Sequence, residues 1–316
     1  EFFLFDVATG QTVRTFSISA DEADNLGCIL WSNAVFGPDS RTVLVGVDER
    51  VITWDTITGD HLRTFSGHSA SVSTIALSRD GHSVLSGDVN GHVILWDFDS
   101  AQEIRRTRGH EDGVSDCLFM PDGRSALTVS QDGTGVVWDL QTGETIRLLE
   151  GGQGGITSAD ISTDGRTMLT YSASGQITLW DVATGQMLRS IVSAFSGGTG
   201  RFTHDNRGIL TNGGELWDLV TGEIIRRYPP GSGIVLGPDG GSFFTGTLQP
   251  APSIVRQRMD SLEYLLVWTL NHRTVRELTC AERALYQLEP ICDSAGAFPT
   301  RTVYPTIQSI NLATPV

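Results

Sequence analysis

Ser130, His110 and Asp132 together have the side-chain composition of a hydrolase triad, in which a base activates a serine and an acid orients the base. Such a nucleophile also needs exposure and an oxyanion site, and no element of this kind is recognisable beside Ser130. The spacing of these residues to Trp138 favours a buried polar network that ties a loop to a sheet. We therefore predict no catalytic residue and no enzymatic activity.

Metal and cofactor chemistry has little support in the sequence. The chain has 7 His and 4 Cys, but no pair has the Cys-x-x-Cys or His-x-x-x-His spacing of a zinc site. The turn at 88–91 lacks the ligand series and closing Glu of a calcium loop. The glycine-rich stretch at 151–155 lacks the Lys-Ser/Thr of a phosphate-binding loop. We predict neither a metal nor a cofactor.

The cysteines leave the compartment open. Cys117 lies at an alternating apolar position, which predicts a buried and inert thiol, whereas Cys28 has no assigned role. Cys280 and Cys292 flank a short helix-like segment, and the sequence does not decide whether they form a disulfide. An oxidised pair would indicate the cell surface, and a reduced pair would indicate the cytoplasm.

Charge narrows the range of partners. The chain has 37 acidic and 22 basic residues, all of the latter Arg, and its net charge of -15 disfavours nucleic acid as a partner. No apolar run approaches the roughly 20 residues that span a bilayer, so we expect no direct membrane insertion. The chain opens on a strand-like stretch at 1–5 without a signal peptide, which indicates a mature or truncated start.

A repeated segment organises most of the chain. In each copy an aromatic residue is followed by a polar residue and then a turn, and successive copies lie 49, 42, 42, 42, 37 and 51 residues apart. The first positions are Phe5, Trp54, Trp96, Trp138, Trp180, Trp217 and Trp268. A period near 40 with a Trp-Asp signature is typical of propeller blades, which must stack because one blade cannot bury its own face.

Residues 110–150 show the unit most clearly. Apolar-rich segments at 113–120, 124–130, 135–139 and 144–149 are separated by turn residues. In the first turn, Pro121 presets one backbone dihedral and Gly123 accepts a positive φ. The pattern predicts four short antiparallel strands in each blade.

These residues resemble the WD-repeat family, and the resemblance covers nearly all of residues 1–278. It implies an all-β fold, a seven-bladed β-propeller of four-stranded blades. It also implies a structural network of His110, Ser130, Asp132 and Trp138. The preceding blade keeps His68 and Trp96 at the same spacing of 28 residues.

Two units depart from the pattern. The first has only the strands Phe2–Phe5 and Thr12–Phe16, so the ring closes with residues before Glu1, with the tail, or with these strands as a partial blade. The unit of Trp268 carries an insertion, Thr247 to Asp260, between its second and third strands. We expect a propeller domain at 1–278 and, at 279–316, a tail that begins with a helix and docks on it.

The stretch from Leu278 to Tyr286 is similar to the tails of bacterial WD-repeat proteins, some of which are sensor regions of multidomain signalling NTPases. The resemblance implies a bacterial source and a larger parent chain. We expect a non-catalytic protein-interaction scaffold or sensor module, with a structural subunit of a bacterial cell-surface or extracellular assembly as the alternative. Its partners would be proteins, including other copies of itself or domains of the parent chain.

The candidates for partner binding are basic and aromatic residues on outer strands and in the unit of Trp268. They are Arg105, Arg106, Arg108, Arg226, Arg227, Tyr228, Arg256 and Arg258. Arg and Tyr are enriched in interface hot spots, although Arg on an edge strand also prevents unwanted pairing.

Overall fold

The computed structural model describes residues 2–6, 9, 11–16, 34–150, 154–247 and 253–259. Packing divides the chain into two units, Glu1–Met259 and Asp260–Val316, and every described residue belongs to the first. The described residues form strands and turns, and no helix among them is suited to crossing a membrane. The expected tail helix, the boundary at 278 and the pair Cys280 and Cys292 lie outside the described residues.

Five sheets have four strands each, paired antiparallel in chain order. Their strands are β3 (Ala34–Phe36), β4 (Thr42–Val47), β5 (Arg50–Asp55) and β6 (His61–Ser66); β7 (Val72–Leu77), β8 (Ser83–Asp88), β9 (His92–Asp97) and β10 (Glu103–Arg108); β11 (Val114–Phe119), β12 (Ser125–Ser130), β13 (Thr134–Asp139) and β14 (Thr145–Glu150); β15 (Ile156–Ile161), β16 (Thr167–Ser172), β17 (Gln176–Asp181) and β18 (Met187–Val192); β19 (Gly200–Phe202), β20 (Gly208–Thr211), β21 (Glu215–Asp218) and β22 (Ile224–Arg227).

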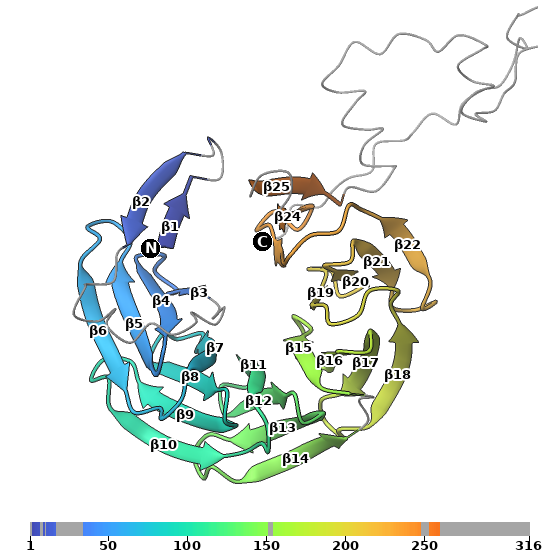
Figure 1. Cartoon of the computed structure of the whole chain (residues 1–316). Coiled ribbons are helices and arrows are strands. Elements are labelled where there is room, and N and C mark those ends of the chain that lie inside the picture. The colour runs from blue at the N-terminus through green and yellow to red at the C-terminus, as the bar shows by residue number, and fades with distance from the viewer. Residues whose placement is uncertain are drawn as a thin grey trace, which may run out of the picture. The chain divides into compact units, whose positions relative to one another are not determined.

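The remaining strands form a two-stranded sheet of β1 (Phe2–Phe5) and β2 (Thr12–Phe16) and a three-stranded sheet of β23 (Ile234–Leu236), β24 (Ser242–Thr247) and β25 (Ser253–Arg258). The described residues therefore form six blades, and the expected number of seven is wrong for them. The sheets follow one another around an axis, with the first strand of each complete blade innermost (Figure 1). The β1–β2 sheet is too short to count as a blade.

The expected insertion between 247 and 260 is instead the third strand of the last blade. Residues of β25 pair antiparallel with β24, from Ser242 opposite Arg258 to Thr247 opposite Ser253. The position held by Trp138 in the β11–β14 blade is thus held here by Gln257, because Ser125 pairs with Asp139 as Ser242 pairs with Arg258. Trp268 lies outside the described residues.

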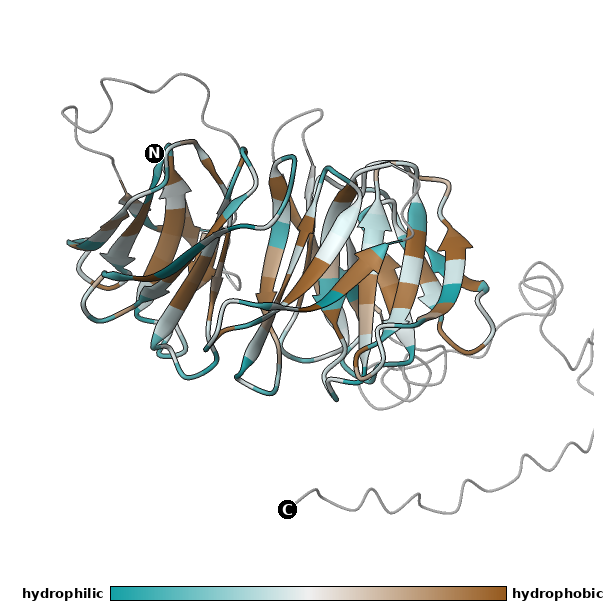
Figure 2. Ribbon diagram, turned by 90° about the horizontal axis from the view of Figure 1, so that it is seen from below, coloured by the Kyte–Doolittle hydropathy of each residue, from teal (hydrophilic) through white to brown (hydrophobic). Residues whose placement is uncertain are grey.

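The hydrophobic core lies between neighbouring sheets. One cluster joins Leu127 and Leu149 of the β11–β14 blade to Met168 and Trp180 of the following blade. Apolar positions recur along the strands in the side view (Figure 2). The β1–β2 sheet obeys the same rule, since the rings of Phe16 and Trp54 lie 5.9 Å apart. Each sheet therefore depends on its neighbour for a dry face.

In the five four-stranded sheets, the aspartate that follows the tryptophan of the third strand organises a turn. Asp139 Oδ1 accepts hydrogen bonds from the backbone N–H of Gln141 at 2.9 Å and of Thr142 at 2.7 Å. Asp55 does the same for Ile57 and Thr58 at 2.8 Å each. Short polar side chains that bond to the backbone two or three residues later are what such turns require. The carboxylate thus fixes the turn that leads into the outer strand.

An arginine on the outer strand then binds the corresponding turn of the next sheet. Arg105 Nη2 donates to the carbonyl oxygen of Gln141 at 2.7 Å, and Arg189 Nη2 donates to that of Val220 at 3.0 Å. The same contact is made by Arg14 to Thr58, by Arg63 to Asp99 and by Arg147 to Ala183. Each of these arginines lies nine residues after the first position of its repeat. We call these five bonds the inter-sheet arginine contacts.

The glycine of the turn makes room for this contact. At Gly143, φ is +76° and an added Cβ would stand 2.3 Å from Cδ of Arg105. A larger residue would therefore strain the backbone and displace the guanidinium. The Thr-Gly pair and the arginine of the preceding blade consequently form one structural unit.

We predict that Arg105→Lys lowers the free energy of unfolding by about 1 kcal/mol, because a flexible ammonium replaces a planar donor that reaches the Gln141 carbonyl. Arg108→Lys on the same strand is the matched control and should leave stability unchanged, since Arg108 is exposed. Urea unfolding followed by tryptophan fluorescence measures both variants. Equal stability of the two would show that the contact contributes nothing.

The pH dependence of stability should depend on Asp55. Its pKa is lowered to about 2 by hydrogen bonds from the Thr58 backbone and the Arg41 side chain. Because the folded pKa lies below the unfolded value, this stabilisation is complete above about pH 5 and is lost as the pH falls towards 2. In Asp55→Asn we expect a smaller loss of unfolding free energy between those pH values than in the parent protein. The control is Asp60→Asn, at an exposed residue nearby. This variant should lose as much unfolding free energy over the same pH range as the parent protein.

Candidate functional site

His110 belongs to a buried network that joins the loop after β10 to the next sheet. Its Nε2 lies 2.8 Å from Oγ1 of Thr128, which also accepts a hydrogen bond of 2.8 Å from Nε1 of Trp138. Its Nδ1 lies 3.0 Å from Oγ1 of Thr134 and 3.3 Å from Asp132. Burial lowers the pKa of His110, although Asp132 acts in the opposite direction. A neutral ring protonated on Nδ1 fits these partners.

Ser130 keeps one expected partner, because its Oγ accepts a hydrogen bond of 3.1 Å from the Asp132 backbone N–H, but it bonds to neither His110 nor Trp138. Its fully buried hydroxyl donates to the carbonyl oxygens of Asp112 and Gly113 at 3.0 and 2.9 Å. The hydroxyl bonded to both His110 and Trp138 belongs to Thr128, two residues earlier on β12. Ser130 is therefore not arranged as a nucleophile activated by His110, and its hydroxyl instead holds the loop before β11.

The preceding blade repeats the arrangement. Nε2 of His68 lies 2.7 Å from Oγ of Ser86, which accepts a hydrogen bond of 2.8 Å from Trp96. Nδ1 of His68 lies 2.9 Å from Asp88. Although burial opposes it, bonds from His68 and the backbone lower the pKa of Asp88. In the β15–β18 blade, Nε1 of Trp180 donates a hydrogen bond of 2.9 Å to Oγ1 of Thr170.

We predict that Thr128→Val lowers the free energy of unfolding by about 1–3 kcal/mol, because it leaves the buried Trp138 N–H and His110 without their shared partner. His110→Ala should cost a similar amount. Thr128→Ser keeps the hydroxyl and is the control, expected to lie closer to the parent in urea unfolding. A Val variant as stable as the Ser variant would contradict the network's role.

The arginines expected to bind partners are spread over three strands. On β10, Arg105 makes an inter-sheet contact, and Arg106 bonds to Glu103 and to the Gly67 carbonyl at 2.6 Å each. Arg108 is exposed at the end of the same strand. Two of these three side chains are therefore engaged in holding the fold.

The other candidates lie on or next to β22 and on β25. Arg226 stacks on the Tyr228 ring at 4.9 Å, and Arg227 pairs with the buried carboxylate of Glu215 at 2.9 Å. Arg256 pairs with Asp239 at 2.6 Å, whereas Arg258 is exposed at the end of β25. The structure does not bring the eight candidates together into one basic surface.

Exposed aliphatic residues repeat on the outer strands instead. The residue immediately before each inter-sheet arginine is apolar, and its counterpart on β22 is also apolar; all are between 41% and 59% exposed. These residues are Val13, Leu62, Ile104, Ile146, Leu188 and Ile225, which we call the side-wall row. The strand register shifts at each of these six positions, so every residue of the row is the extra residue of a β-bulge. Their constant place in the repeat was a sequence signal that the search for charged residues missed.

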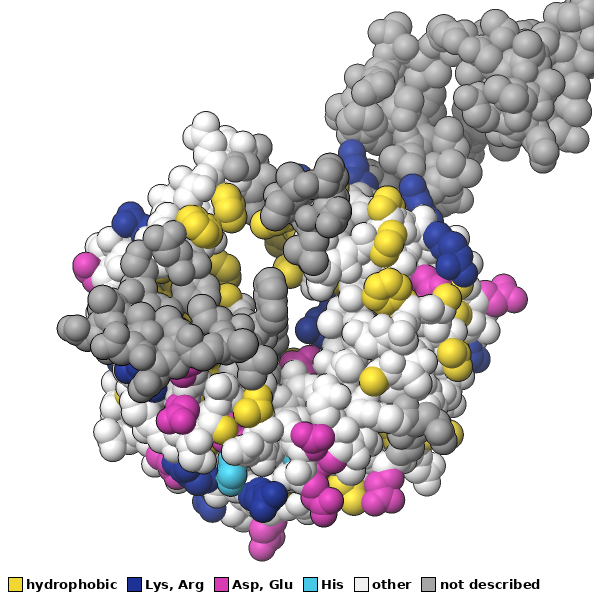
Figure 3. All heavy atoms as spheres, in the orientation of Figure 1, with side chains coloured by type: hydrophobic (Ala, Val, Ile, Leu, Met, Phe, Trp, Pro, Cys, Tyr) yellow, Lys and Arg dark blue, Asp and Glu magenta, His cyan; other side chains and the backbone are white. Residues whose placement is uncertain are grey.

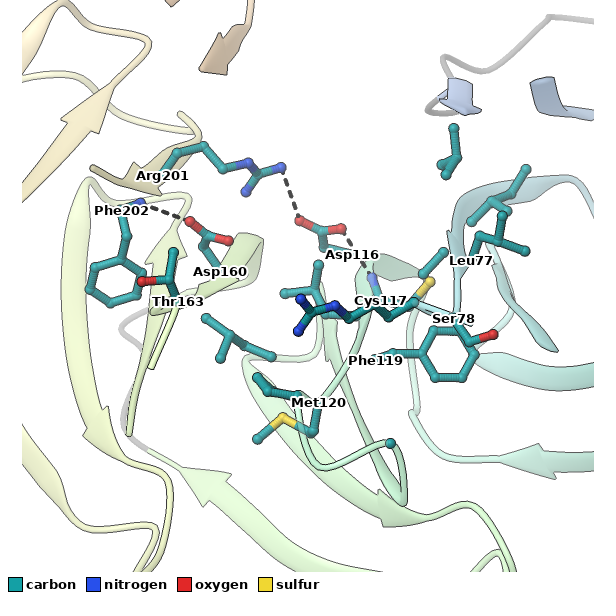
Figure 4. A pocket seen from close by; sticks show the side chains of 18 of the residues that line it. Leu77, Ser78, Asp116, Cys117, Phe119, Met120, Asp160, Thr163, Arg201 and Phe202 are labelled. Atoms are coloured by element: carbon teal, nitrogen blue, oxygen red, sulfur yellow. Dashed lines mark hydrogen bonds and ion pairs between the residues drawn. The ribbon is translucent and has the colours of Figure 1, made fainter. Parts of the chain in front are cut away.

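A cavity of about 1280 Å³ lies along the innermost strands. Hydrophobic side chains and side chains of both charge signs border the hollow in the space-filling view (Figure 3). Arg201 of β19 points towards Asp116 of β11, with its Nη2 3.7 Å from Oδ2 of that aspartate (Figure 4). Asp160 lies on β15, the inner strand of the intervening blade. Burial raises the pKa of both aspartates, although Arg201 acts in the opposite direction.

Neither a metal nor a thiol reaction is favoured by the described geometry. Among the residues that the structure describes, no group of three or more His, Cys, Asp or Glu side chains could hold a metal ion. Cys117 is buried, and burial raises the pKa of its thiol. Such a thiol is a poor nucleophile.

The segments that match a known family model correspond to blades of the structure. The family model for the WD domain, G-beta repeat, matches residues 59–97, 101–139 and 143–181. No curated protein matches the chain. Each matched segment begins near the outer strand of one blade and ends at the third strand of the next. With three matched repeats in a propeller-like succession of blades, this protein is a WD-repeat β-propeller.

Proposed function

We propose that the chain is a non-catalytic scaffold or sensor module of a larger bacterial protein, and that it binds a protein partner through its side wall. WD-repeat propellers are generally protein-interaction scaffolds. The observation that carries the proposal is the side-wall row, which exposes one aliphatic side chain in each of six successive units. Aliphatic positions repeated on a strongly acidic surface favour contact with another protein.

On β18 the side-wall residue has further exposed apolar residues beside it in the same strand. Here Met187 and Leu188 are each 57% exposed, and Val192 is 69% exposed. Arg189 lies between Leu188 and Val192 in the strand and binds the next sheet, which anchors the strand. A rigid apolar strand loses little conformational freedom when a partner covers it. We therefore place the centre of the partner surface on β18.

The proposal predicts that the double variant Leu188→Glu, Val192→Glu loses its partner. Cross-linking and affinity capture from cells of the source organism, quantified by mass spectrometry, should show at least about a tenfold loss of one or more captured proteins, because carboxylates replace the apolar contact. Purified candidates would then be titrated against the parent and the variant. Ile57→Glu, in the exposed turn between β5 and β6 and outside the side-wall row, is the control and should retain them.

Two outcomes would contradict the proposal. One is a set of captured proteins that does not change in the double variant while its unfolding transition matches that of the parent. The other is sedimentation of the purified chain as an oligomer that the same substitutions dissociate. That result would favour the alternative of a self-assembled structural subunit.

A further inference from the structure

Two charged residues of the cavity occupy a position that is apolar in the other blades. Asp160 and Arg201 pair with Leu169 and Leu210, the same register position at which Leu118 pairs with Leu127. In the remaining inner strands this position holds Val35, Ala76 and Val235. Only β15 and β19, among the inner strands described, thus place a charge at this level of the cavity.

Arg201 does not balance the carboxylates around it. Its Nη1 donates to Oγ of Ser158 at 3.0 Å and to the Ala159 carbonyl at 2.7 Å. Only Nη2 approaches a carboxylate, and its distance to Asp116 exceeds that of a hydrogen bond. Asp160 instead accepts from the Phe202 backbone N–H at 2.7 Å. One guanidinium therefore shares its charge between two poorly solvated carboxylates.

The cavity lining as a whole contains more acidic than basic side chains. It includes four aspartates, at 80, 116, 122 and 160, against Arg79 and Arg201, with His204 as a further titratable group. Beside the carboxylates the wall is apolar, with Leu77, Leu118 and Phe119 from neighbouring inner strands. Carboxylates next to apolar side chains suit a ligand with a positive head and an aliphatic stem.

We propose that this cavity binds an organic cation, a primary ammonium or guanidinium on an aliphatic stem. The charged head lies between Asp116 and Asp160, where it supplies the charge that Arg201 does not. The stem packs against Leu118 and Leu77. Such a group occurs both in free polyamines and in the basic side chains of peptides, and the chemistry of the cavity is the same for both. The site is separate from the side-wall row.

Isothermal titration of the full chain tests the proposal at pH 7 and constant ionic strength. Spermidine represents the free amine, and N-acetyl-lysine methylamide and N-acetyl-arginine methylamide represent the peptide side chain. Magnesium chloride measures the binding of simple cations. Saturable binding of at least one organic cation, much tighter than that of magnesium, is expected. Binding of spermidine alone assigns a free polyamine, and binding of an amide alone assigns a protein segment.

Asp160→Asn is the decisive variant. The amide can still accept the Phe202 N–H, so the fold should persist, while affinity for the organic cation should fall about tenfold because a charged partner is lost. Asp164→Asn is the matched control, since it removes the same charge from an exposed turn of the same blade outside the cavity lining. Thermal unfolding of both variants checks that the structure is intact.

Other results would overturn the inference. These are an affinity that is equal for spermidine and magnesium, or one that Asp160→Asn and Asp164→Asn reduce alike, because either would indicate attraction to the net charge alone. The double variant at Leu188 and Val192 should bind the cation as the parent does. Failure at the side wall and failure in the cavity can therefore be told apart.

Discussion

The contact between neighbouring sheets is the interaction on which every other feature depends. No sheet here has a core of its own, and Trp180 is buried because residues of the β11–β14 blade cover it. Three structural features result from this stacking. The histidine network lies where a loop enters a blade, the arginine contacts lie along the outer strands, and the cavity lies along the inner strands. Each is a product of placing one sheet against the next.

Local patterns were sufficient to predict the blades. The period of 42 residues, the Asp-Gly and Thr-Gly turns and the alternation within strands each depend on neighbours in sequence, and the five four-stranded sheets follow them. The unit near Trp268 could not be predicted in this way. Its third strand is rich in arginine and lacks the tryptophan signature, so only the pairing with β24 reveals it.

The site was less accessible from sequence because it depends on choices between similar residues. Thr128 and Ser130 are two hydroxyl residues on the same face of β12, and both are spaced plausibly from His110. Only the geometry shows which one meets Trp138. The cavity is harder still, since Asp116, Asp160 and Arg201 come from three successive sheets. The pKa of the turn residue Asp139 is lowered and that of the inner residue Asp160 is raised, although the residue type is the same.

The inter-sheet arginine contacts all run in one direction. Each guanidinium lies on the earlier sheet and each carbonyl on the later one, from Arg14 to Thr58 through to Arg189 and Val220. During synthesis on the ribosome, the donor of every pair is therefore made before its acceptor. Each outer strand is therefore already present as a donor when the turn that it contacts is made.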